Sequence, residues 1–287
     1  MTPAPPDPVP QGSPDSSAPT FPCPKINWLP GMAIAIAALA SAILLQRAPL
    51  ANLTRQGDQV SLASLEQDLA KTQRNLAFLK QAPSFGFRNL IANWTFLQFL
   101  QYFGDDEARA RTSYALSPDF FEVILDRDPY FLDGYFFLSA SSSLYAGKPE
   151  RAIAIINRNL PRLNPQLPPR AYYIWRYKAI DELLFLGDSA AARASFLQAA
   201  DWAKAYDDPE ANSVASSSIQ TAQFLASNPD SRAAQISAWT MVLSNAIDDD
   251  TRAIAVERMQ SLGAKLEPTP DGQFRVILPP ESPNPVP

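Results

Sequence analysis

Carboxylates are the side chains of this 287-residue chain that could do chemistry, because it contains no histidine and a single cysteine, Cys23. The lack of histidine removes the commonest general base, the commonest metal ligand and every Ser-His or Cys-His nucleophile pair. Four aspartates follow one another closely, at Asp119, Asp126, Asp128 and Asp133, and two of them could serve a glycosidase-like cleft. Their spacing singles out no pair, so a carboxylate enzyme is the least favoured interpretation.

Further acidic residues are grouped where helices are expected to begin or end, at 105–107, 207–208 and 248–250. Carboxylates at helix N-termini are favoured by capping and by the helix dipole, so we interpret these groups as structural. The chain has no phosphate-binding glycine-rich loop and no calcium-loop spacing. We expect no catalytic residue, no metal and no cofactor. The net charge of -5 argues against a nucleic-acid partner.

The elements that could carry a function lie between two proline-rich ends. Ten of the first thirty residues and seven of the last twenty are proline. Such segments cannot bury enough apolar surface to offset their ordering entropy, so we expect 1–24 and 279–287 to be disordered. The folded part then covers roughly 58–278, which is enough for a sizeable core.

Residues 26–46 carry no charge and are bracketed by Lys25 and Arg47. A helix of this length would be about 31 Å long, which matches a hydrocarbon core of about 30 Å. We therefore predict a single-pass transmembrane helix; a cleaved signal peptide is the alternative, with an Ala-Ser-Ala match at 40–42. Positive residues near the segment number one before it and two after it, which favours the cytoplasmic side for the domain that follows.

Small residues recur every four positions in this segment, at Ala33, Ala37 and Ser41. Such a face could let two membrane helices pack closely, although an anchor without a partner fits the sequence as well. A homodimer through the anchor is therefore one open alternative.

The segment 58–82 has an apolar heptad at Leu62, Leu65, Leu69, Thr72, Leu76 and Leu79. It contains fewer than three heptads, which is short for an independent coiled coil. We predict an amphipathic stalk helix that packs on the following domain, with a dimeric stem as the alternative. The next segment, 86–105, is apolar on nearly all sides of a helix, which predicts a helix buried among other elements.

Short turns recur after aromatic or leucine-rich segments, at Gly104, Gly147, Gly187 and Asn228, at intervals of 43, 40 and 41 residues. Proline-containing breaks fall between these turns. Glycine suits the left-handed conformation past a helix end, so the pattern predicts helix pairs. The pairs would cover 85–127, 129–163, 168–206 and 209–247, with a closing helix at 249–262. This periodicity is typical of an all-α fold with an α-solenoid of about four helix pairs over 85–262.

The second and third pairs resemble tetratricopeptide repeats. Ala192, Phe196 and Ala199 follow Gly187 at the small, bulky and small positions of that repeat's second helix. Ala152 and Ile156 follow Gly147 at the same offsets, whereas Asn159 departs from the expected small residue, and the period is about 40 rather than the family's 34. The layout also looks like that of membrane-anchored repeat proteins of bacteria, cyanobacteria among them.

This resemblance implies a groove for a partner protein along the first helices of the pairs. It makes Tyr173, Arg176, Tyr177 and Asp181 candidate groove residues, because they share one helix face at three- and four-residue spacing. The alternative is that the two tyrosines pack between neighbouring pairs. Aromatic and arginine side chains are enriched at binding hot spots.

Half of the thirty aromatic residues fall between 85 and 137, which is too dense for all of them to be covered. We expect a contact patch that includes Tyr130, Phe131 and Phe136. Downstream, a Pro-Asp-Gly turn at 270–272 between apolar residues predicts a small β-hairpin at 263–278.

Three functions remain from the sequence. The favoured one is a membrane-anchored scaffold that binds protein partners during recruitment or assembly of a membrane complex, with the bilayer as its second partner. A permanent structural subunit of such a complex is the alternative, and the carboxylate enzyme is third.

Overall fold

The computed structural model describes residues 39–41, 61–268 and 274–279. The chain divides into a unit over Met1–Val60 and a unit over Ser61–Pro287. The second unit is mostly helical. Its helices are α2 (Leu62–Gln81), α3 (Arg88–Phe103), α4 (Asp106–Thr112), α5 (Ser117–Arg127), α6 (Leu132–Leu138), the π-helix η2 (Ser139–Tyr145), α7 (Pro149–Asn159), the 3-10 turn η3 (Leu160–Arg162), α8 (Tyr172–Leu184), α9 (Ser189–Ala203), α10 (Pro209–Ser227), α11 (Arg232–Asn245) and α12 (Asp249–Ser261).

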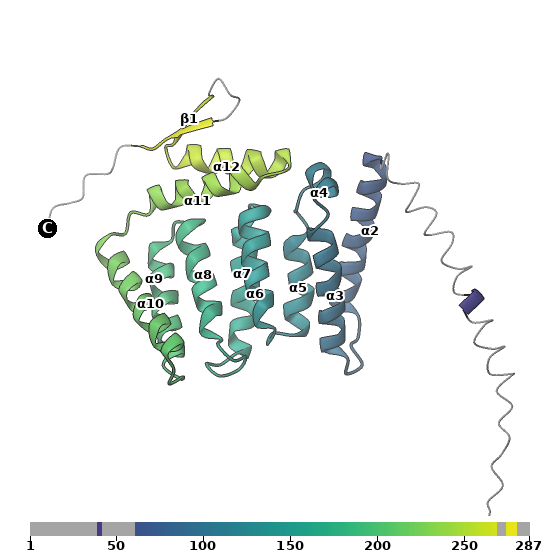
Figure 1. Cartoon of the computed structure of the whole chain (residues 1–287), viewed down its shortest axis with the longest axis horizontal. Helices are drawn as coiled ribbons and strands as arrows, with labels where there is room; N and C mark the ends of the chain where they lie inside the picture. Colours follow the sequence, from purple (N-terminus) through teal and green to yellow (C-terminus); the bar gives the residue numbers. More distant parts are fainter. Residues whose placement is uncertain (1–38, 42–60, 269–273, 280–287) are drawn as a thin grey trace, which may run out of the picture. The chain divides into compact units, whose positions relative to one another are not determined.

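Within this unit, α2, α3 and α5 to α10 stand side by side, the short helix α4 lies at one end of them, and α11 and α12 lie across that same end (Figure 1). Helix packing is most extensive between α8 and α9, between α9 and α10, and between α3 and α5. Two of the predicted glycine turns have the expected left-handed conformation, with Gly147 and Gly187 at φ 61° and 70°. Gly104 also ends its helix, but at a φ of -84° in the right-handed region. Asp188 and Asp208 cap the helices that follow, accepting from the N–H groups of Ala191 and Ala211.

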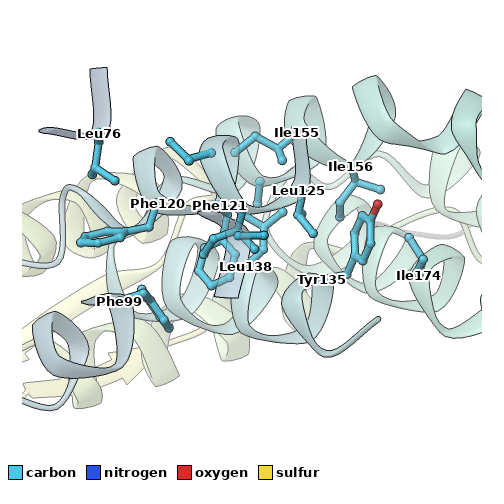
Figure 2. Packing of buried hydrophobic residues seen from close by; sticks show 14 of the residues in the cluster. Leu76, Phe99, Phe120, Phe121, Leu125, Tyr135, Leu138, Ile155, Ile156 and Ile174 are labelled. Carbon is cyan, nitrogen blue, oxygen red and sulfur yellow. The ribbon is translucent and has the colours of Figure 1, made fainter. Parts of the chain in front are cut away.

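The largest core cluster joins α3, α5, α6 and α7 (Figure 2). Phe99 is fully buried and meets Phe121 edge-on with ring centroids 4.6 Å apart. Tyr135 is also fully buried, and its Oη donates to the carbonyl of Pro129 at 2.9 Å. The buried hydroxyl of Tyr135 therefore has a hydrogen-bond partner, and the buried aromatic rings of this part of the sequence fill one continuous core.

The helix α2 packs on α5 of its own chain. Leu76 is buried, and Leu69 and Leu79 lie partly buried against the main core. The guanidinium of Arg127 on α5 donates to the carbonyls of Leu79 and Ala82, which fixes the end of α2. In the C-terminal part of α2, the heptad leucines therefore pack against the core of the same chain.

The prediction that the helix after the stalk is buried among other elements holds for one face of α3 and is wrong for the other. On α3, the side chains of Ala92, Thr95, Phe99 and Tyr102 are buried. The opposite face is exposed, because α5 and α4 pack on α3 and the ring of Phe137 on α6 contacts Phe96 and Phe99, all away from that face. A helix can be apolar all round and still present one uncovered face when it has too few neighbours.

The fourth predicted pair also differs from the structure. The helix α11 packs mainly on α12, η2 and α8 rather than on α10. Its Trp239 is buried against Phe185 at the end of α8, with ring centroids 5.5 Å apart. Regular stacking therefore stops after α10, because α11 is needed to cover the apolar ends of α8 and η2.

The predicted C-terminal hairpin is confirmed. Strands β1 (Lys265–Pro268) and β2 (Phe274–Ile277) pair antiparallel, with Leu266 opposite Val276. These two residues are packed against the cluster formed by α11 and α12. A two-stranded sheet is marginal alone, so this contact supports it.

Most of the predicted membrane segment lies outside the described residues, including Ala33 and Ala37. Of its packing face only Ser41 is described, exposed in a short helical turn at 39–41. In the part of the chain that the structure describes, no helix combines the length and apolarity needed to cross a bilayer.

Candidate partner-binding face

The candidate face is formed by α6 and α8, which pack against each other. Phe136 of α6 is 49% exposed, and Tyr177 and Tyr173 of α8 are partly buried. The ring centroids of Phe136 and Tyr177 are 5.8 Å apart, and those of Tyr177 and Tyr173 are 6.2 Å apart with nearly parallel planes. We call Phe136, Tyr177 and Tyr173 the aromatic row. The aromatic row brings together Tyr173 and Tyr177, which were predicted as groove residues, and Phe136, which was predicted as part of a contact patch.

The predicted groove residue Arg176 lies beside this row and reaches toward α10. Its Nη1 donates to the hydroxyls of Ser217 and Ser218 at 2.9 and 3.1 Å. Tyr173 makes a similar contact, since its Oη donates to Glu210 at 2.8 Å. Arg176 and Tyr173 therefore each connect α8 to α10 through a hydrogen bond. For Tyr173 this agrees with the alternative that the tyrosines pack between neighbouring helix pairs. Both side chains are still partly accessible at the surface.

The electrostatics of the row are set by carboxylates. The hydrogen bond to Glu210 is the main reason that the pKa of Tyr173 is raised to about 12, with burial adding to it. Burial raises the pKa of Tyr177, and the nearby charge of Asp133 adds to that rise. Both phenols therefore stay neutral at physiological pH. The hydroxyl of Tyr177 can donate a hydrogen bond to a bound partner, whereas that of Tyr173 already donates to Glu210.

Asp181 is the predicted groove residue that the structure removes from the surface. It is fully buried and accepts hydrogen bonds from Ser139 at 2.8 Å and Ser143 at 3.0 Å. Eight residues separate it from Tyr173, and at 100° per residue this offset turns it about 80° away from that tyrosine. Ile180, rotated only about 20° from Tyr173, continues the surface and is 37% exposed.

The buried Asp181 joins η2 to α8 and lies next to a second polar contact. Lys178 pairs with Glu182 within α8, and Ser195 of α9 connects them by accepting from Lys178 at 2.9 Å and donating to Glu182 at 2.6 Å. Burial raises the pKa of Asp181 to about 7, although the two serine hydroxyls lower it in part. The two tyrosines of the aromatic row therefore belong to a helix, α8, whose buried side carries the polar residues Lys178, Asp181 and Glu182.

The predicted contact patch is divided by the structure. Phe136 and Tyr130 are exposed, and Tyr130 is 44% exposed at the start of α6. Phe131 is partly buried instead, because its ring meets Phe96 of α3 edge-on with centroids 4.9 Å apart. Of the three predicted patch residues, Phe136 and Tyr130 are the ones exposed to a partner.

Three of the four aspartates considered for catalysis are engaged in other contacts. Asp119 pairs with Arg151 at 2.9 Å, and Asp126 pairs with Arg158 at 3.0 Å. Asp128 accepts from the backbone N–H of Tyr130 at 3.1 Å. Among the described residues, no group of three or more acidic or cysteine side chains could hold a metal ion.

Sequence reasoning missed two surface features of this unit. One is Ile180, which the periodicity itself would have placed beside Tyr173 and Tyr177. The other is the exposed face of α3, which carries Leu90, Trp94 and Leu97. The sequence of α3 did not indicate which face is exposed, because the helix has apolar residues on every side.

Comparison with known proteins adds no family to this description. The chain matches no protein-family model, and no curated protein or solved structure is significantly similar to it.

Proposed function

We propose that this chain is a membrane-anchored scaffold of tetratricopeptide-like helical repeats that binds another protein through the aromatic row. The observation that carries this proposal is the exposed ring of Phe136 on α6 beside the partly buried rings of Tyr177 and Tyr173 on α8, which are joined by ring contacts. Aromatic side chains supply large contact areas at low entropic cost and dominate binding hot spots. The surface fits an apolar face of a partner helix or peptide.

The packing of the helix pairs supports the repeat assignment. Ala152 and Ala192, at the small positions of the resemblance, are both fully buried, and Phe196 is nearly so. Small residues at a helix crossing allow close approach, and a bulky residue one turn later fills the groove. Asn159 is buried at the position expected to be small, and its amide is satisfied by the carbonyl of Ile155 and by Arg162.

The membrane part of the proposal rests on the sequence of residues 26–46. An uncharged segment of 21 residues matches a bilayer span, and the flanking charges favour the repeat domain on the cytoplasmic side. Resistance of the full chain to extraction by alkaline carbonate is the expected result, and release into the supernatant would contradict the anchor.

Photo-crosslinking tests the partner site. A photoreactive amino acid at Ile180 of the full chain in native membranes should give a discrete protein adduct. The matched control is the same residue at Met241 on α11, which is 55% exposed and apolar. If position 180 labels only lipid or the chain itself, or labels no more than position 241, the partner site is wrong. A stable one-to-one adduct partner in purified complexes would favour a permanent subunit, and a substoichiometric one would favour a recruiting scaffold.

A further inference from the structure

The second exposed apolar surface is a stripe on α3. Leu90, Trp94 and Leu97 are 64%, 58% and 54% exposed. They follow one another at four and three residues, so they share one face of the helix. We call these three residues the α3 stripe. Large apolar side chains exposed together in this way mark an interaction surface.

Two phenylalanines extend the stripe into the preceding turn. Phe85 and Phe87 are 83% and 65% exposed. Phe85 has a φ of 47°, in the left-handed region that bulky residues rarely adopt. The turn therefore presents an aromatic side chain to solvent in a backbone conformation that glycine would adopt more easily. A strained exposed residue of this kind points to a function rather than to folding.

The two helices near the stripe carry more basic than acidic residues. Together α2 and α3 contain four basic residues, Lys71, Arg74, Lys80 and Arg88, and two acidic ones, Glu66 and Asp68, although the net charge of the whole chain is -5. Lys80 is paired with Glu122 of α5. Lys71 and Arg74 are exposed on α2 and form no ion pair with any residue in the described ranges. The first two helices thus combine apolar, aromatic and basic side chains, the composition of helices that lie at a bilayer surface.

The chain length places this surface within reach of a membrane. Fourteen residues, 47–60, separate the predicted membrane segment from α2. Fourteen residues span at most about 50 Å when extended. The 20-residue α2 is about 30 Å long. The end of α2 and the start of α3 can therefore meet the bilayer that the segment 26–46 would enter.

We propose that the α3 stripe, with Phe85 and Phe87, lies against the surface of an anionic bilayer and holds the repeat domain on it. This proposal rests on the membrane anchor of the proposed function. The tether raises the local concentration of the stripe at the lipid surface, so weak interfacial contacts are sufficient. The basic residues Lys71 and Arg74, which form no ion pair within the described residues, favour an anionic lipid surface over a neutral one.

Depth-dependent quenching in the full chain tests the proposal. In a Cys23→Ser background, Leu97→Cys is labelled with an environment-sensitive fluorophore and the protein is reconstituted into phosphatidylcholine vesicles with or without phosphatidylglycerol. The matched control is Phe224→Cys on α10, a site 62% exposed at the far end of the helical array from α3 (Figure 1). Nitroxide-bearing lipids should quench the label at 97 and not at 224, and mainly when phosphatidylglycerol is present. Lys71→Gln and Arg74→Gln should each lower the docked-to-undocked ratio about fivefold.

The outcomes separate this proposal from the anchor. If carbonate does not extract the chain but lipid quenching at 97 equals that at 224, the stripe proposal fails and the anchor stands. If carbonate extracts the chain and quenching at 97 persists in phosphatidylglycerol vesicles, the stripe binds lipid and the anchor fails. If 97 is shielded from a water-soluble quencher without lipid quenching, a protein covers the stripe and the proposal is overturned. If carbonate extracts the chain and lipids do not quench the label at 97, the anchor and the stripe proposal are both overturned.

Discussion

Asp181 provides the most detailed prediction, because burial gives this carboxyl a pH-dependent effect on stability. Its pKa is raised from the ordinary 3.8 to about 7 in the folded chain. Between these values the unfolded chain has lost the proton and the folded chain has kept it. The free energy of unfolding therefore decreases as the pH rises from about 4 to about 7, and the full penalty is present above pH 7.

The size of this penalty follows from the shift. Three pKa units correspond to about 4 kcal/mol. Asp181→Asn removes the ionisation while keeping the shape, so it should stabilise the chain at pH 8. The gain should be about 2–4 kcal/mol, because the amide has to reorganise the contacts with Ser139 and Ser143. Near pH 4 the substitution should have little effect.

The assay is chemical unfolding of the full chain in one detergent, at several pH values from 4 to 8, followed by circular dichroism. The difference between the variant and the unchanged chain cancels the contribution of other groups that titrate. Asp207→Asn, at an exposed loop carboxylate, is the matched control and should leave the profile unchanged. A stability difference for Asp181→Asn that does not vary with pH, or that is destabilising at pH 8, would refute the reasoning.

Three further substitutions test the packing by the same unfolding measurement. Ala192→Leu should destabilise the α8–α9 crossing by about 1–3 kcal/mol, since Ala192 is fully buried; an unchanged midpoint would show that the crossing has room. Phe99→Ala should cost about 3–5 kcal/mol by opening a cavity in the main core, and a loss below about 1 kcal/mol would contradict the burial of this ring. Lys178→Met should cost about 3–5 kcal/mol because it leaves Glu182 buried without its ion partner; adding Glu182→Leu should then recover much of that loss, and no recovery would argue against the buried pair.

Periodicity and turn chemistry were enough to predict the helical fold and the C-terminal hairpin. Gly147 and Gly187 end helices in the left-handed conformation, and aspartates cap several of the helices that follow. These are local effects that depend on residues close in sequence. The departure at α11 depends instead on which apolar helix ends need cover, such as Phe185 under Trp239, and no local pattern contains that information.

The candidate site could be predicted only in part for the same reason. Tyr173 and Tyr177 reached the surface as expected, whereas Asp181 turned inward because three- and four-residue steps add up to a rotation over two turns. Phe136 belongs with the two tyrosines through contact between helices 40 residues apart in sequence. The α3 stripe was missed because the exposure of an apolar face depends on how many neighbours the helix has.

The proposed scaffold function depends most on the aromatic row as a protein-binding surface. The most direct measurement is the affinity of the full chain, purified from membranes, for the partner identified by crosslinking at position 180, compared with that of Phe136→Ala and Tyr177→Ala. Each substitution at a hot spot should weaken binding by about thirtyfold, while Phe224→Ala leaves it unchanged. Equal affinity in all four proteins would contradict the account.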